Sequence, residues 1–140
     1  MVSFFVPGIP VPKGSARAFY IKKLNRTVVT QTNADKQKPW ASLISLKAEE
    51  AHVILDSGPV SVKIAFYFPR PKSHYGTGRN AGLLKDSAPR NHVSKPDLDK
   101  LVRCVLDALT SVAYYDDSQV VEVRARKEFG VHPGAEIEVK

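Results

Sequence analysis

The clearest hydrophobic pattern in the chain runs from Val60 to Phe68, where apolar side chains occupy every second position. Strict alternation of this kind is typical of a half-buried β-strand. Shorter apolar runs predict further strands at residues 4–6, 120–126 and 135–139. Two more runs, at residues 19–21 and 27–30, flank a polar stretch that contains Asn25, which favours a hairpin.

Two other stretches show helical spacing instead. In residues 35–55 the apolar positions recur every three or four residues, and Asp56-Ser57-Gly58-Pro59 closes the pattern. A second apolar set, from Leu98 to Leu109, predicts a helix that runs to about Ser111. The order of strands, helix, strand, helix and strands indicates an α+β fold. We expect a single domain over residues 1–140, with two main helices packed on a mixed sheet of about five strands.

Between the long strand and the second helix, residues at about 70–95 show no period and form a basic loop. Only Asp86 opposes the positive charges of this segment. A loop of this length inside a compact domain is usually functional or disordered. The charge favours an arm that orders on a polyanion, and a surface loop without a partner is nearly as good an interpretation.

Composition restricts the class of protein. The chain has 140 residues and a formal net charge of +7, with 43% apolar and 25% charged residues, which suits one globular domain. No apolar run approaches the roughly 18 residues that a membrane span needs, and the first residues lack the basic region of a signal peptide. Cys104 is the single cysteine, which excludes an internal disulfide and a cysteine-clustered metal site. We therefore expect a cytoplasmic protein without a membrane partner.

The charge is unevenly distributed along the chain. Residues 1–95 hold 15 basic and 5 acidic residues, whereas residues 96–140 hold 6 basic and 9 acidic ones. A nuclease needs a basic surface for phosphates and a local group of carboxylates for a metal ion. A merely solvated surface would give the same totals, so the net charge favours a nucleic-acid partner only slightly.

The carboxylates supply the candidate chemistry. Asp97 and Asp99 stand at the start of the second helix, where they could share an ion only if Asp97 is still extended and Asp99 lies in the first turn. Capping of the helix is the simpler role for one such aspartate. Asp116 and Asp117 follow the helix and could return to face them, or could simply form a turn. Asp107 ranks below these, either as a solvated residue or as the i,i+4 partner of Arg103.

A set of oxygen ligands without a histidine or cysteine cluster suits Mg²⁺, with Mn²⁺ as a substitute, better than zinc. In a basic protein such a set indicates metal-assisted hydrolysis of a phosphodiester. His92 lies five residues before Asp97 and could touch DNA or ligate metal, although an ordinary loop histidine is the simpler interpretation.

Three segments together resemble the RusA-type Holliday junction resolvases, a family of small endonucleases. They are Lys95-Pro96-Asp97-Leu98-Asp99-Lys100-Leu101, Val105-Leu106-Asp107-Ala108-Leu109 and Tyr115-Asp116-Asp117-Ser118-Gln119-Val120. Residues 8–17 also resemble the Pro-Lys-Gly segment of that family. The resemblance spans residues 4 to about 127. It implies a RusA-like fold and a homodimeric, Mg²⁺-dependent enzyme that nicks four-way DNA junctions symmetrically.

The resemblance also assigns roles to particular residues. The catalytic, metal-binding aspartates of the family fall on Asp97, Asp99 and Asp117, and Asp116 matches a less essential neighbour. The functional lysine of the family falls on Arg103, which keeps the charge but does not easily release a proton. An asparagine that often follows the second aspartate is Lys100 here, so Lys100 is an alternative carrier of that positive charge.

Position in or near the loops is what indicates the candidate phosphate-binding residues. They are Lys13, Arg17, Arg70, Lys72, Arg79, Arg90, Lys95 and Lys100. Two other functions stay open: a non-catalytic DNA-binding module that uses the same basic loop, and a metal-dependent nuclease without preference for junctions.

Overall fold

The main sheet has four strands, in the order β1 (Val2–Pro7), β6 (Gly134–Val139), β4 (Val60–Phe68) and β5 (Val120–Phe129). This computed structural model describes residues 1–14, 16–31 and 33–140. Strand β6 pairs antiparallel with both β1 and β4, so that Ile137 lies opposite Phe4 on one side and Ile64 on the other. Strand β5 pairs parallel with β4. The alternation over residues 60–68 therefore predicted one of the two central strands with its bounds correct.

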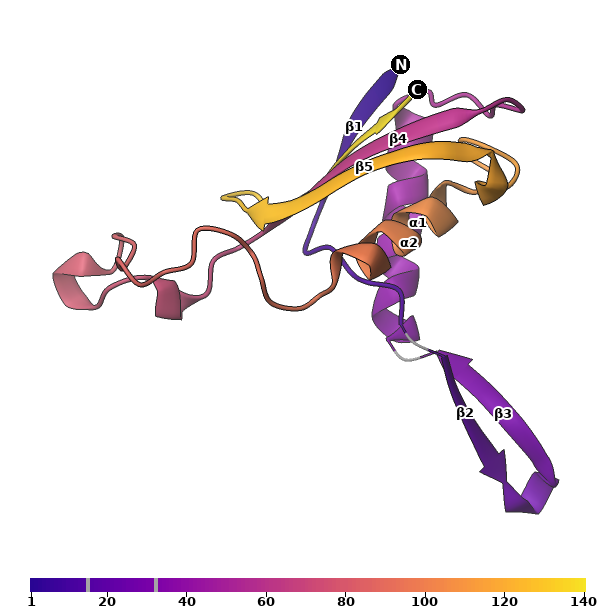
Figure 1. The fold of residues 1–140 in the computed structure, drawn as a ribbon, viewed down its shortest axis with the longest axis horizontal. Helices are drawn as coiled ribbons and strands as arrows, with labels where there is room; N and C mark the ends of the chain where they lie inside the picture. The colour runs from indigo at the N-terminus through magenta and orange to yellow at the C-terminus, as the bar shows by residue number, and fades with distance from the viewer. Residues whose placement is uncertain (15, 32) are drawn as a thin grey trace.

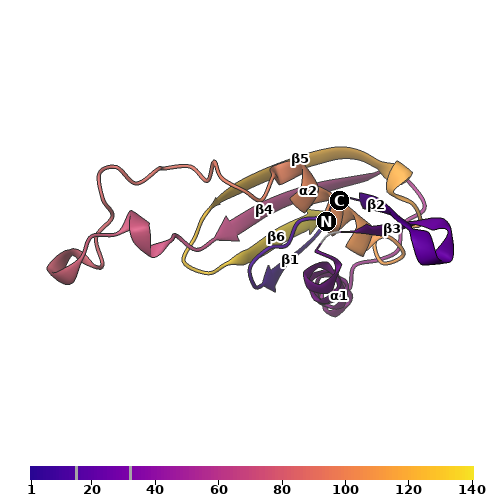
Figure 2. The same cartoon turned by 90° about the horizontal axis from the view of Figure 1, so that it is seen from below.

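Both long helices, α1 (Ala34–Glu50) and α2 (Leu98–Leu109), lie on one face of this sheet (Figures 1 and 2). Helix α1 contacts β1 and α2, whereas α2 also contacts β5. The apolar stripe of α2 is buried because Leu101, Val105 and Leu109 face the inner side chains of the strands. The result is a two-layer α+β fold, as the sequence predicts.

Helix α1 ends five residues earlier than the pattern of apolar positions indicates. His52 adopts a left-handed conformation with φ of 62°, and the N–H of Val53 donates to the carbonyl of Ala48 at 3.1 Å. This is the Schellman arrangement that closes helices. Leu55, which continues the apolar period, lies beyond this turn and is 38% exposed.

The predicted hairpin forms, but it does not join the main sheet. Among the described residues, strands β2 (Ala16–Ile21) and β3 (Arg26–Gln31) pair only with each other, and Asn25 takes the left-handed turn conformation at φ of 49°. The hairpin projects away from the helices and the main sheet (Figure 1). The sheet of about five strands is thus a sheet of four plus a separate pair.

The basic loop also forms a projection, which we call the basic arm (residues 69–97) (Figure 1). It contains two short 3-10 turns, η2 (Lys72–His74) and η3 (Gly78–Asn80). Tyr75 and Leu84 form an antiparallel bridge, and the N–H of Gly76 donates to the carbonyl of Leu83 at 3.0 Å. The arm is therefore a folded-back excursion with internal hydrogen bonds rather than a structureless loop.

Hydropathy along the helices also bears on the membrane question. Among the described residues, no helix combines the length and the apolar character needed to cross a bilayer.

Candidate active site

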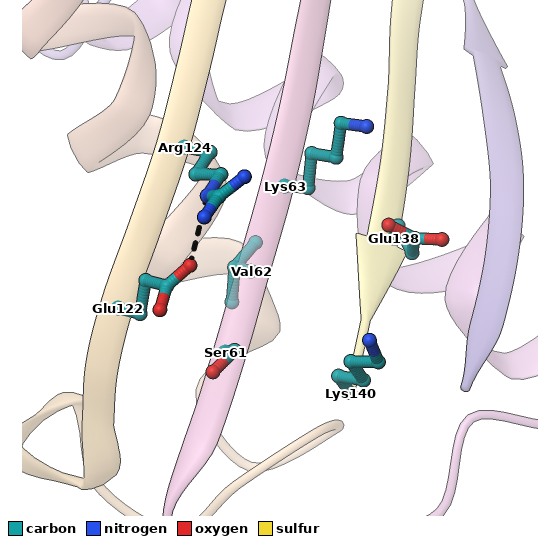
Figure 3. A pocket seen from close by; sticks show the side chains of 7 residues that line it. All are labelled: Ser61, Val62, Lys63, Glu122, Arg124, Glu138 and Lys140. Atoms are coloured by element: carbon teal, nitrogen blue, oxygen red, sulfur yellow. Dashed lines mark hydrogen bonds and ion pairs between the residues drawn. The ribbon is translucent and has the colours of Figure 1, made fainter.

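The open face of the main sheet is hollowed, but its charges do not suit metal chemistry. A depression of about 250 Å³ lies over β4, β5 and β6 (Figure 3). Its lining mixes Lys63, Arg124 and Lys140 with Glu122 and Glu138, and the Nε of Arg124 donates to Glu122 at 2.9 Å. Acids and bases interleave here and none of the aspartates that the sequence singles out lines the depression, so we look for the candidate site at those aspartates.

The start of α2 presents two aspartates in the backbone arrangement that a shared site requires. Asp97 is extended, with φ of −71° and ψ of 140°, and the helix begins at the next residue, which places Asp99 in the first turn. Among the described residues, no backbone N–H at the start of α2 donates a hydrogen bond to the Asp97 side chain. Both side chains are exposed. Capping therefore does not account for the Asp97 carboxylate, which is left for other chemistry.

Lys127 on β5 fixes the chain just before Asp97. Its Nζ donates to the carbonyl oxygen of Ser94 at 2.6 Å and to that of Pro96 at 2.8 Å. These bonds tie the end of the basic arm to the sheet and so set where Asp97 lies. Sequence reasoning missed this residue, because a lysine on a strand gives no sign that it bonds two distant backbone carbonyls.

The second pair of aspartates belongs to the connection between α2 and β5. Asp116 caps the short turn η4 (Asp117–Gln119): its carboxylate accepts from the N–H of Ser118 at 2.8 Å, and the Gln119 side chain accepts from the N–H of Asp116 at 3.1 Å. The hydrogen bonds from Ser118 lower the pKa of the Asp116 carboxyl. Asp116 thus has a local structural role, and Asp117 is exposed beside it.

Lys13 brings the N-terminal segment to this region. Gly8, at φ of 123°, turns the chain out of β1, a conformation that only glycine adopts without strain. The N–H of Lys13 then donates to the carbonyl of Lys100 at 3.0 Å, and its Nζ lies 2.6 Å from Oδ2 of Asp107. Asp107, which the sequence offered as a partner for Arg103, is therefore paired with Lys13.

Lys13 borders two cavities. On one side is a pocket of about 420 Å³, which we call the acidic pocket; it is lined by Lys13, Asp107, Thr110, Asp116 and Asp117. On the other is a groove of about 1040 Å³ whose walls include Lys13, Asp97, Lys95, Lys100 and the Ile9–Pro12 segment. The structure thus places Asp117 with Asp107 and places Asp97 across Lys13 from them.

The predicted metal site is tested by this arrangement in two ways. The donor chemistry fits, because all the candidate ligands are hard carboxylate oxygens. The positions are less favourable: among the described residues, no three histidine, cysteine, aspartate or glutamate side chains gather closely enough to hold one ion. The eight residue steps from Asp99 to Asp107 correspond to about 12 Å of helix axis. A shared ion therefore requires Asp97 and Asp99, at the start of α2, to approach Asp117 in the acidic pocket.

The predicted phosphate-binding residues divide into two groups. Lys72, Arg79, Arg90 and Lys95 are exposed along the basic arm. Arg70 instead supports the base of the arm, because its guanidinium lies 4.3 Å from the centroid of the Phe129 ring and donates to the carbonyl of Pro89 at 2.8 Å. The side chain of Arg17 lies outside the part of the chain that the structure describes. Arg103 is exposed on the face of α2 that also carries Asp99 and Asp107.

His92 anchors the base of the basic arm. It is 9% exposed, and its ring lies 4.6 Å from that of Phe68 and 5.0 Å from that of Phe129. Burial, and next the charge of Lys127, lower its pKa. This packing favours a structural role over the roles in DNA contact or metal binding that the sequence left open. Burial likewise raises the pKa of Cys104 to about 11, as suits a small core residue.

Sequence reasoning also overlooked the hairpin as a basic surface. Lys22, Lys23 and Arg26 are exposed at its turn, far along the chain from the basic arm. The sequence signal for this basic surface is the short run of positive charge at residues 22–26. A hairpin pattern alone predicts strand pairing and does not show that the turn projects from the rest of the fold.

Comparison with known proteins assigns the chain to a family of nucleases. The family model described as endodeoxyribonuclease RusA matches residues 7–140, so the chain belongs to the RusA endodeoxyribonuclease family. Nucleases of this family generally depend on divalent metal ions. The chain is also 30% identical, over 99% of its own length and 95% of the relative's, to the uncharacterized protein YqaN of Bacillus subtilis (strain 168).

Proposed function

We propose that this protein is a Mg²⁺-dependent endonuclease that nicks four-way DNA junctions symmetrically, in DNA recombination and repair. We place it in the cytoplasm of a bacterial or phage-infected cell, as a homodimer. The observation that carries the proposal is the extended, uncapped Asp97 at the start of α2, followed by Asp99 in the first turn. In a RusA-family chain of net charge +7, carboxylates presented in this way can bind the metal ion while the basic surface binds DNA.

Asp97, Asp99 and Asp117 would hold the metal, with Asp116 as a secondary ligand because its carboxylate already caps η4. A bound Mg²⁺ or Mn²⁺ acidifies water and neutralises charge on a phosphate. Arg103, exposed on the same helix face, contacts phosphate as a planar, permanently charged fork. Lys127 keeps Asp97 in place through the carbonyls of Ser94 and Pro96.

The DNA is bound by the two basic projections and the residues around the groove. Exposed Lys72, Arg79 and Arg90 along the arm suit the phosphates of one duplex branch, and the turn of the hairpin adds a second basic surface. A four-way junction has near two-fold symmetry, and paired nicks need two acidic sites at a fixed separation. A closed two-fold dimer provides them.

The direct test compares nicking of a four-way junction, a matched duplex and a single strand, with and without Mg²⁺. We expect paired nicks in the junction only, and only with metal. Asp97→Asn, Asp99→Asn and Asp117→Asn should each abolish nicking while junction binding is kept or improved, because less negative charge faces the phosphates. Glu49→Gln, an exposed acid on α1, is the matched control and should cleave normally.

The outcomes separate the open functions. Equal nicking of junction and duplex would identify a nuclease without junction preference. Junction binding without nicking under any metal would identify a binding module. Loss of binding together with nicking in all three variants would show that the aspartates maintain the fold. Sedimentation of the free protein at micromolar concentration tests the dimer, and a monomer that still makes paired nicks would contradict it.

A further inference from the structure

We propose that Lys13 is a tethered counter-ion that partly neutralises the acidic pocket in the metal-free protein and competes with the metal ion for the site. The proposal rests on the proposed function, since it concerns the same carboxylates. Its basis is the ion pair between Nζ of Lys13 and Oδ2 of Asp107, at 2.6 Å, on the wall between the acidic pocket and the groove that contains Asp97.

The position of Lys13 is set by the backbone and not by its flexible side chain alone. Gly8 turns the segment at φ of 123°, and its N–H donates to the carbonyl of Pro133 at 3.1 Å. Pro10 is buried, and the N–H of Lys13 is held by the carbonyl of Lys100 at 3.0 Å. The segment is therefore fixed at both ends, and the ammonium group is placed beside Asp107 in the last turn of α2.

The charges around that ammonium group explain why it stays there. The acidic pocket holds the three carboxylates of Asp107, Asp116 and Asp117, and Lys13 is the only cation that lines it among the described residues. Carboxylates so placed repel one another, and one ammonium group relieves part of that repulsion. A divalent ion relieves more of it, so the ion and Lys13 compete for the same negative potential.

The same geometry gives Lys13 a second task after it is displaced. Because its backbone stays bonded to Lys100, the released ammonium group remains within reach of both cavities. There it can contact a phosphate group bound at the mouth of the groove beside Asp97. Lys13 is thus expected to weaken metal binding and yet assist cleavage, and a merely structural lysine would do neither.

The experiment measures Mn²⁺ binding by electron paramagnetic resonance in the absence of DNA, so that the readout does not depend on activity. Lys13→Met should bind Mn²⁺ about fivefold more tightly, which is the upper end of what an ion pair of this exposure contributes. Lys13→Arg keeps the charge and should bind like the wild type. Lys47→Met is the matched control, because the Lys47 side chain also forms an ion pair, with Glu50, and is 32% exposed against 30% for Lys13. This variant should leave the affinity for Mn²⁺ unchanged.

Junction nicking at saturating Mg²⁺ supplies the second half of the test. Lys13→Met should nick at least tenfold more slowly than the wild type despite its tighter metal binding, and Lys13→Arg should restore most of the rate. Unchanged or weaker Mn²⁺ binding in Lys13→Met overturns the proposal. If Asp117→Asn also leaves Mn²⁺ binding unaltered, it is the proposed metal site that fails, and the two failures are therefore distinguishable.

Discussion

Lys127→Met removes the two hydrogen bonds that tie the end of the basic arm to β5, and it keeps a side chain of similar length. The lost partners are the carbonyl oxygens of Ser94 and Pro96, at 2.6 and 2.8 Å from Nζ. Because Asp97 follows Pro96 directly, the variant should loosen the candidate site as well as the fold. Stability and cleavage are therefore both expected to fall, and by different amounts.

The loss of stability can be worked out from the two bonds. The bond to Ser94 is exposed and that to Pro96 is partly buried, so water competes for the donor and each contributes about 1 kcal/mol, or about 2 kcal/mol together. In a chain of this size that corresponds to a decrease in Tm of about 6 °C. Misplacement of a reacting group by about 1 Å can cost about 100-fold in rate. Cleavage should therefore fall far more than the folded fraction does.

Two measurements check this expectation. Thermal unfolding followed by circular dichroism gives the change in Tm, and junction nicking is assayed well below the Tm of the variant. Lys63→Met, which replaces an exposed lysine on the neighbouring strand β4, is the matched control and should change neither quantity. Wild-type nicking by Lys127→Met, at a temperature where it is folded, would refute the reasoning that Lys127 positions Asp97.

Two further predictions concern single side chains. Burial lowers the pKa of His92 below its usual 6.5, so the unfolded chain binds the proton more readily than the folded one. The contribution of neutral His92 to the free energy of unfolding is therefore complete above pH 6.5. It declines as the pH falls from 6.5 toward the lower pKa of the folded state. His92→Phe should flatten the dependence of Tm on pH between 7.5 and 5.5, whereas the exposed His132→Gln should not, and an unaltered slope in His92→Phe would contradict the assignment. Arg103→Ala should lower junction nicking much more than Arg103→Lys, since Arg103 shares a helix face with Asp99, and wild-type rates in the alanine variant would place Arg103 outside the site.

The sequence predicts those parts of the fold whose signals are local. The alternation over residues 60–68 is bounded by Pro59 and Pro69, so both the type of element and its ends could be read. The end of α1 could not, because the helix closes at His52 in a left-handed conformation that is usually marked by glycine. The separation of the hairpin from the main sheet could not be predicted either, because it depends on which strands pair over long distances in the chain.

The candidate site shows the same division. The spacing of the two residues sets a condition for a shared ion, an extended Asp97 followed by Asp99 in the first turn, and the backbone of the structure meets it. The partner of Asp107 did not follow from the sequence, because Lys13 is 94 residues away and the local pattern offered Arg103 instead. The role of Lys127 could not be predicted either, since its acceptors are backbone carbonyls, which are present at every position of a chain. The roles of the aspartates themselves stay predictions.

The order of strands in the main sheet also governs when the protein can fold. Strand β6 is the last strand made and yet lies between β1, the first, and β4. Until residues 134–139 have emerged from the ribosome, β1 lacks the neighbour that holds it in the sheet, and α1 lacks a complete layer to pack on. The parallel pair of β4 and β5 adds a second late step, because it must close the long connection that contains the arm and α2. The main sheet can therefore close only after residues 134–139 have been made, whereas α2 and the aspartates of its flanking connections are made before them.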